Sequence, residues 1–300
     1  MPKSNTSGKG YFCIISALLI WSSQGIVIRA AKMPVVSLIF YSLMVSLLIQ
    51  SFIFLRASKG LPTARGLLHI FVLSVLSLIN TLTYYYAFSY TSISNAVFTH
   101  YIAPVVVMVL APIFLKERVT MAAVFSVATA SFGLWIIMRD VSVLDVAAQI
   151  FSSGPNFFTG QRFKPDTIGI ICGLTSGVAY GAIIIVLKII SVRNNKYAVV
   201  FFQNLFVVML LMPFAGPAPS IAESLWIVVG MGVLYSTAAT YLYYGGIAHV
   251  GANKAAILGY IEPIGAIFFG ALVLSELPDM LSLLGGLLII AAGYIVIKKG

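Results

Sequence analysis

The chain has 300 residues, of which 60% are apolar and only 9% are charged. Charged residues make up roughly a quarter of an ordinary soluble domain, so this composition excludes that class and predicts a protein that resides in a lipid bilayer. The net charge of +10 is spread between apolar segments. It therefore indicates membrane orientation and argues against nucleic acid as a partner.

About 20 apolar residues are needed to cross a bilayer as a helix, and on this measure the sequence predicts an all-α integral membrane protein with ten transmembrane helices. In chain order they lie near 11–30, 36–55, 67–88, 93–115, 119–138, 167–189, 197–214, 223–247, 252–274 and 279–297. The segment 139–166 between the fifth and sixth helices has no apolar run long enough to cross. It is predicted to be an external linker, with a functional lid as the alternative.

The second half of the chain repeats the first at an offset of 159 residues, as Tyr101 and Tyr260 illustrate. Each repeat holds five spans, and because this number is odd, the second repeat must enter the membrane upside down. Two inverted five-helix repeats, here assigned to 1–138 and 167–300, are how many secondary transporters build exchangeable halves around one central site. The sequence therefore predicts transport by alternating access.

Basic residues are concentrated on the side of the membrane that carries the N-terminus. Of the 18 Lys and Arg residues, only Arg29, Lys32, Arg139, Arg162 and Lys164 fall on the opposite side. Because cytoplasmic loops carry an excess of Lys and Arg, both termini are predicted to be cytoplasmic. The location is then the cell membrane, inner or plasma, crossed many times.

Four glycines, Gly169, Gly173, Gly177 and Gly181, recur at every fourth position of the sixth predicted helix. Residues four apart share a helix face, so these glycines form a bare stripe that another helix can approach closely. The stripe is predicted to be a packing face, with a sliding contact during transport as the alternative.

Two prolines and four charged residues also occupy repeat-equivalent positions. Pro104 and Pro263 lie inside predicted spans, where each removes a backbone hydrogen bond and favours a kink. The charged residues at span junctions are Arg29, Glu117, Lys188 and Glu276. The carboxylates are predicted to stabilise the start of the following helix, and the cations the end of the preceding one.

A recurrent pattern joins these segments. The apolar run Tyr101–Pro104 ends in proline and is followed about a dozen residues later by Glu117, and Tyr260–Pro263 is followed in the same way by Glu276. Duplicated at one offset, this pattern resembles the EamA-type branch of the drug/metabolite transporter superfamily over nearly the whole chain. Ser275 departs from it, because a basic residue or Gly is more usual there. The resemblance implies a ten-helix carrier with a cavity between its halves, which moves amino acids, amines or other small metabolites, often outward.

Polar and aromatic residues inside spans are costly next to lipid, so they are predicted to face the cavity or another helix. Three aromatic pairs related by the repeat would converge at the centre: Trp21 with Tyr180, Tyr84 with Tyr243, and Tyr101 with Tyr260. With the amides of Gln24 and Asn80 and the carboxyl group of Glu262, they make up the candidate substrate-binding residues. Rings with polar tips suit an amphipathic metabolite or an amine; the alternative is that they anchor the helices at the headgroups.

Glu262 is the only carboxylate well inside a predicted span, and its repeat counterpart is Ala103. A carboxylate in that place can bind a substrate ammonium or load and release a proton. The alternative is a hydrogen bond to the backbone freed by Pro263. His100 is the second candidate for proton coupling because imidazole titrates near neutral pH, although it is expected nearer the outer end of its span.

The sequence thus predicts a secondary active transporter of small organic metabolites such as amino acids or amines, an exporter or exchanger that acts as a monomer or homodimer. A channel-like permease is the first alternative. An intramembrane enzyme is the second, but the sequence holds no zinc-protease or serine-hydrolase motif. Cys13 and Cys172 have no nearby His or Cys, so no metal or cofactor is predicted.

Overall fold

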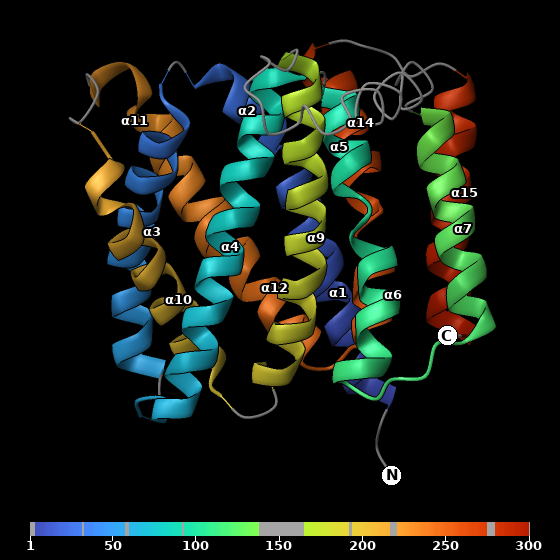
Figure 1. Ribbon diagram of the computed structural model, residues 1–300, viewed down its shortest axis with the longest axis horizontal. Coiled ribbons are helices and arrows are strands. Elements are labelled where there is room, and N and C mark those ends of the chain that lie inside the picture. Colours follow the sequence, from blue (N-terminus) through green and yellow to red (C-terminus); the bar gives the residue numbers. More distant parts are fainter. Residues whose placement is uncertain are drawn as a thin grey trace, which may run out of the picture.

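The computed structural model describes residues 4–31, 33–57, 60–91, 93–137, 165–191, 194–216, 221–274 and 280–299, and every regular element in these ranges is a helix (Figure 1). The first half comprises α1 (Ser4–Ser22), α2 (Gln24–Ala30), α3 (Val35–Ala57), α4 (Ala64–Tyr90), α5 (Ile93–His100), α6 (Ala103–Phe114) and α7 (Met121–Ile137). The second half comprises α9 (Pro165–Ser191), α10 (Lys196–Leu211), η2 (Met212–Phe214), α11 (Ile221–Gly230), η3 (Met231–Ala239), α12 (Thr240–Ile247), α13 (Ala252–Leu258), α14 (Ile261–Leu274) and α15 (Met280–Lys299). Residues 139–164 of the predicted linker, and Glu276, lie outside the described residues.

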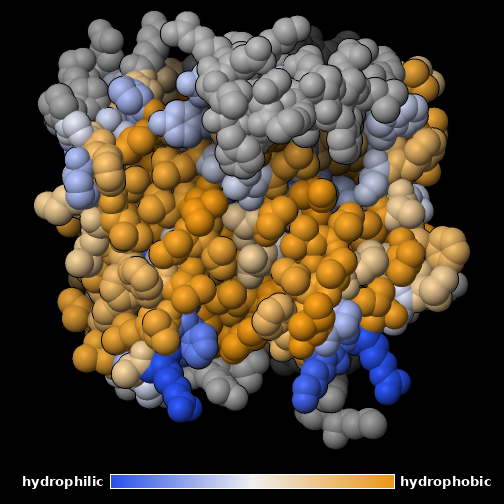
Figure 2. Space-filling view, in the orientation of Figure 1, coloured by the Kyte–Doolittle hydropathy of each residue, from blue (hydrophilic) through white to orange (hydrophobic). Residues whose placement is uncertain are grey.

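Within the described ranges, seven helical segments are long and apolar enough to cross a bilayer. They are Gly8–Ile28, Val35–Ala57, Ala64–Tyr90, Ala96–Phe114, Thr167–Ser191, Lys196–Phe214 and Ser224–Ile247. Two shorter apolar helices cover Met121–Ile136 and Leu283–Lys298. Figure 2 shows a broad hydrophobic band across the middle of one face of the molecule and strongly hydrophilic residues at its lower edge. The fold is therefore that of a multi-pass helical membrane protein.

The first helices of the two halves run in opposite directions (Figure 1). α1 begins at the lower face, where α15 also ends, and this side is called the terminal face. α9 begins at the opposite face and descends to the terminal face. This arrangement is the one that an odd number of spans per repeat requires.

The boundary between the halves is marked by a residue that touches its own counterpart. The rings of Tyr101 and Tyr260 stack with their centroids 5.5 Å apart, and the Tyr260 hydroxyl donates to the Tyr101 carbonyl over 3.5 Å. A contact between equivalent residues occurs only close to the axis that relates two copies. α7 and α15, whose first residues Met121 and Met280 are also equivalent, pack side by side at the edge of the molecule (Figure 1).

The glycine stripe of α9 packs against the helix pair α5–α6. A Cβ atom added at Gly173, Gly177 or Gly181 would meet the hydroxyl of Thr99, the carbonyl of His100 or the side chain of Val106, respectively. The predicted packing face is therefore confirmed, while a sliding contact during transport stays a prediction. Because these glycines have no side chains, α9 packs directly against the end of α5.

Both predicted proline kinks are confirmed as interruptions of the helix. α5 ends at His100 and α6 begins at Ala103, while α13 ends at Leu258 and α14 begins at Ile261. Each gap lies directly before the equivalent prolines, Pro104 and Pro263. The two breaks bring polar side chains and free backbone groups to the middle of the molecule, where intact helices would present only one face.

Two further irregularities were not predicted. The first span is broken at Ser23, between α1 and α2, and the span predicted over 223–247 is π-helical from Met231 to Ala239. A π-helix leaves backbone carbonyls free for other donors and is common at functional sites. Here the freed Tyr235 carbonyl accepts hydrogen bonds from the Trp21 indole at 3.3 Å and the Thr240 hydroxyl at 3.1 Å.

Two charged residues at the terminal face stabilise ends of helices that are distant in the sequence. The carboxylate of Glu117 accepts hydrogen bonds from the backbone N–H groups of Ala252 and Asn253 at the start of α13. The Lys188 ammonium donates to the carbonyls of Ile247, Ala248 and Val250 at the end of α12. The predicted type of interaction with helix ends is therefore correct, but the predicted partners, the neighbouring helix and the residue's own helix, are wrong. Helix ends from distant parts of the chain lie side by side at this face, and the pattern of charges along a sequence does not reveal which of them are in contact.

We expect Gly177→Ala to lower the thermal stability of the protein by about 1–3 kcal/mol, because the added methyl group overpacks the contact with the His100 carbonyl. Loss of the monodisperse peak of purified protein on heating in detergent measures the effect. Gly293→Ala is the matched control, because a Cβ at this glycine of α15 meets nothing within 4 Å. Equal melting of the two variants would contradict the packing role of the stripe.

Candidate functional site

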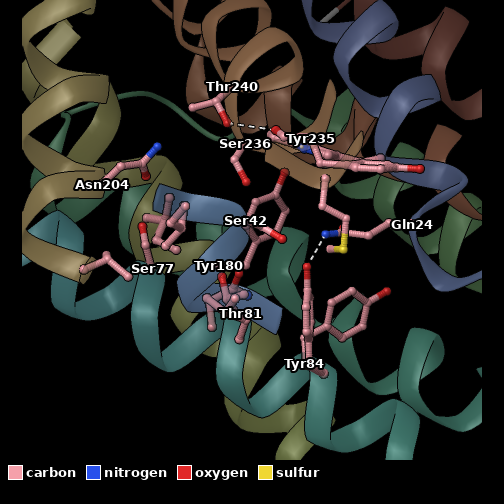
Figure 3. A pocket seen from close by; sticks show the side chains of 18 of the residues that line it. Gln24, Ser42, Ser77, Thr81, Tyr84, Tyr180, Asn204, Tyr235, Ser236 and Thr240 are labelled. Carbon is pink, nitrogen blue, oxygen red and sulfur yellow. Dashed lines mark hydrogen bonds between the residues drawn. The ribbon is translucent and has the colours of Figure 1, made fainter. Parts of the chain in front are cut away.

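A central cavity lies between the two halves, with a volume of ≈ 1110 Å³ including the part open to solvent. Its walls come from α1 to α5, α9, α10, η3, α12 and α14. Figure 3 shows Gln24, Ser42, Thr81 and Tyr235 on different helices around this space.

The structure brings together eight of the ten residues predicted for substrate binding or proton coupling. Those that line the cavity are Trp21, Gln24, Asn80, Tyr84, His100, Tyr180, Tyr243 and Glu262. Tyr101 and Tyr260 do not belong to its wall. They are almost fully buried, at 4% and 1% exposure, and stack on each other behind His100. The helix breaks account for this position, since each tyrosine falls inside a break and so leaves the helix face on which it was predicted.

Aromatic rings form a continuous wall along one side of the cavity. Trp21 packs on Tyr243 with ring centroids 5.1 Å apart, and the Tyr180 hydroxyl donates to the Tyr243 hydroxyl over 3.2 Å. The His100 ring stacks between Tyr84 and Tyr180, at 4.2 and 5.2 Å. This wall offers π-faces and polar tips to the same ligand.

His100 is only 4% exposed and lines the central cavity, four residues into the span Ala96–Phe114. Its Nδ1 atom lies 2.7 Å from the Ser176 hydroxyl, which also accepts a hydrogen bond from the Asn80 amide at 3.1 Å. The break after residue 100 ends α5 in mid-membrane and leaves the imidazole inside. His100, Ser176 and Asn80 therefore form one polar cluster between α4, α5 and α9.

Glu262 contributes the cavity's only carboxyl group, and no Lys or Arg stands among the lining residues of the described chain. Its carboxyl group lies close to the Tyr101 hydroxyl, although the two form no hydrogen bond of regular geometry. An acidic group surrounded by aromatic rings favours a positively charged or protonatable ligand.

Several lining residues were missed by the sequence reasoning. Tyr85 accepts a hydrogen bond from Gln24 at 2.5 Å, and Tyr235 shares one with Ser23 at 2.7 Å. Tyr244 donates to Gln203, whose amide donates to Ser77 at 2.9 Å. Tyr85 and Tyr244 carried a usable signal, because they are a repeated pair directly next to Tyr84 and Tyr243. Gln203, an amide in an apolar span, carried another.

Ser42 of α3 also lines the cavity (Figure 3). Its hydroxyl is buried and has no hydrogen-bond partner within the described residues. A buried hydroxyl without a partner is uncommon in a protein interior. It is free to bind a ligand in the cavity.

Apolar helices that cross a bilayer and enclose a polar, aromatic cavity are the architecture of a membrane transporter. The EamA-like transporter family matches residues 8–139 and 167–298, which together make up most of the chain. The protein therefore belongs to the EamA-like transporter family. The two matched blocks are consecutive and cover each half separately.

Two curated relatives support this assignment. An uncharacterized transporter of Archaeoglobus fulgidus is 23% identical over 76% of this chain and 75% of its own length. The pseudopaline exporter CntI of Pseudomonas aeruginosa is 20% identical over 88% of this chain and 86% of its own. Both are named as transporters and neither as an enzyme.

The fold is also that of a solved protein. A crystal structure superposes with a TM-score of 0.76 at 15% sequence identity and covers 96% of both chains. At this identity the likeness concerns the fold alone.

We expect Ser176→Ala to destabilise the protein by about 1–3 kcal/mol, because it leaves His100 and Asn80 without a shared buried partner. Thermal unfolding of the purified protein measures the loss. Thr175→Ala is the control, because the Thr175 hydroxyl is exposed and binds only the Ile171 carbonyl of its own helix. The polar cluster has no stabilising role if both variants melt at the wild-type temperature.

Proposed function

We propose that the protein is a secondary active transporter of small amphipathic metabolites that carry a protonatable amine, such as amines or amino acids. The observation that carries this proposal is the central cavity, in which Glu262 is the only acidic group and aromatic rings form one wall. The transported amine binds Glu262 as an ammonium ion, and Trp21, Tyr84, Tyr180 and Tyr243 hold its cationic and apolar parts. The Ser42 hydroxyl and the Asn80 amide bind its polar end.

Transport proceeds by alternating access between two inverted repeats, 1–138 and 167–300, with ten spans in all and residues 139–166 as the external linker. Three observations support this arrangement: the opposed directions of α1 and α9, the stacking of Tyr101 on its counterpart Tyr260, and the two separate family matches. The helix breaks at equivalent places in the two halves give each half a point at which it can bend. The chain lies in the cell membrane with both termini in the cytoplasm, as the excess of basic residues on the terminal face supports.

The direction of transport is outward. This part of the proposal is supported by the similarity to a protein named as a pseudopaline exporter. Proton coupling requires a group that exchanges a proton inside the cavity, and Glu262 fills this role because ammonium and proton compete for one carboxylate. His100, held by Ser176, is the second proton-exchanging group.

Reconstituted protein separates a carrier from a channel. We expect flux of labelled amines and amino acids into proteoliposomes to saturate with concentration and to show counterflow, in which unlabelled substrate on one side drives labelled substrate against its gradient. A thermal-shift screen of the same compounds selects the substrate, since ligands that bind the folded state raise its stability. Flux that neither saturates nor shows counterflow would identify a channel-like permease.

We expect Glu262→Gln to abolish flux driven by a proton gradient and to leave substrate exchange partly intact, because a neutral amide exchanges no proton at neutral pH. Flux in proteoliposomes with and without an imposed pH gradient measures both activities. Glu262→Asp is the matched variant, since it keeps the carboxyl group and should retain gradient-driven flux. Undiminished proton dependence in Glu262→Gln would exclude the coupling role.

We expect Trp21→Ala to weaken substrate binding on the order of tenfold, because the lost cation–π contact contributes about 0.5–2 kcal/mol in a desolvated site. Ligand titration of the purified protein gives the affinity directly. Trp226→Ala controls for the loss of a tryptophan, since this residue of α11 lies 65% exposed on the outer surface. Equal affinities of the two variants would remove Trp21 from the binding site.

A further inference from the structure

A second cavity of ≈ 590 Å³ lies between the central cavity and the terminal face. Its walls include Ser191, Asn194 and Lys196 at the junction of α9 and α10, and His249 in the turn after α12. That turn lies beside Gly10 of α1, close to the start of the described chain. The second cavity therefore belongs to the terminal face, and it is lined by polar and basic groups that suit contact with water.

Tyr244 stands between the two cavities. Among the described residues it is the one that lines both, and it is only 6% exposed. Its hydroxyl donates to Gln203 on α10, and the Gln203 amide donates to Ser77 on α4 over 2.9 Å. These hydrogen bonds thus link α12 to α10 and α4 at the end of the central cavity nearest the terminal face, which is called the floor of the cavity.

We propose that Tyr244, held by Gln203 and Ser77, is the gate between the central cavity and the terminal face, and that the second cavity is the continuation of the transport path. Substrate passes when the Tyr244 hydroxyl leaves Gln203 and its ring swings away from the floor. The role of this gate in transport rests on the proposed carrier function. Whether Tyr244 closes the central cavity toward the terminal face does not rest on it, because access to the cavity can be measured without substrate.

The repeat counterpart of Tyr244 is held by a similar hydrogen bond. Tyr85, the repeat counterpart of Tyr244, is also buried in the cavity wall, and its hydroxyl is held by Gln24 at 2.5 Å. Gln24 and Gln203 are not repeat counterparts, so the two tyrosines bind amide groups at positions that the repeat does not relate. In this proposal the two equivalent tyrosines, each held at its hydroxyl, act as barriers toward opposite faces.

Chemical labelling tests the gate directly. The reporter is Thr81→Cys, made after Cys13 and Cys172 are replaced by Ser. Thr81 lines the central cavity one helical turn beyond Ser77 and so lies directly behind the proposed floor. A charged methanethiosulfonate reagent that does not cross membranes is applied to sealed vesicles, and a C-terminal tag reports which vesicles expose the terminal face.

We expect Tyr244→Phe to raise the labelling rate from the terminal face about fivefold, the equilibrium shift that loss of one hydrogen bond of about 1 kcal/mol produces. Tyr244→Ala removes the ring as well and should raise the rate further, to more than about tenfold. Tyr85→Phe is the matched control and should speed labelling only from the opposite face.

Tyr244→Phe decides the test if Tyr244→Ala fails to fold, because the phenylalanine keeps the packed volume. An unchanged rate from the terminal face, or an equal rise from both faces, would overturn the gate. Failure of the proposed transport function would leave these labelling rates as they are and would show itself only in the flux measurements.

Discussion

Inside a bilayer no water is available to pair a polar group, so each N–H, carbonyl and polar side chain needs a partner within the protein. The rest of the structure follows from this constraint. At two irregular places side chains bind backbone carbonyls: the Tyr235 carbonyl in the π-helix accepts from the Trp21 indole, and the carbonyls of the turn at 247–250 accept from Lys188. Polar side chains gather at the same breaks, which is why the cavity forms there and why its wall is a network instead of a set of isolated residues.

The sequence predicted the helical membrane fold, the repeat, the close helix contact along the glycine stripe and the two proline breaks. Each of these features produces a regular spacing of residues that can be recognised along the chain. It also predicted eight of the 23 described residues that line the cavity, because aromatic, amide and ionisable side chains inside spans are costly next to lipid. What escaped prediction depends on three dimensions. Tyr101 and Tyr260 lie behind the cavity because the breaks turn them out of their helix faces, and the π-helix at Met231–Ala239 brings Tyr235 and Ser236 into the wall by shifting the helical period. Glu117 stabilises a helix of the other half and Lys188 a distant helix of its own half, and no charge pattern along one helix reveals a partner 59 to 136 residues away.

The cavity is built from equivalent residues that have acquired different surroundings. Tyr84 stacks on His100, whereas its counterpart Tyr243 packs on Trp21 and binds the Tyr180 hydroxyl. One side of the aromatic wall thus presents an imidazole and the other an indole. A ligand bound between them meets a different chemical surface on each side, so it has a preferred orientation even though the scaffold around it repeats.

The contact between Tyr101 and Tyr260 has a consequence for the origin of this asymmetry. In a dimer of two identical five-helix chains, a glutamate at the position of Glu262 would appear twice, beside the shared axis, and two like charges that close cannot both stay ionised. Joined in a single gene, the copies are free to diverge, and here one carries Glu262 where the other carries the buried Ala103. A lone carboxylate at the centre of a nearly symmetric molecule is thus something that fusion of the duplicated halves permits and that self-association of one half would prevent.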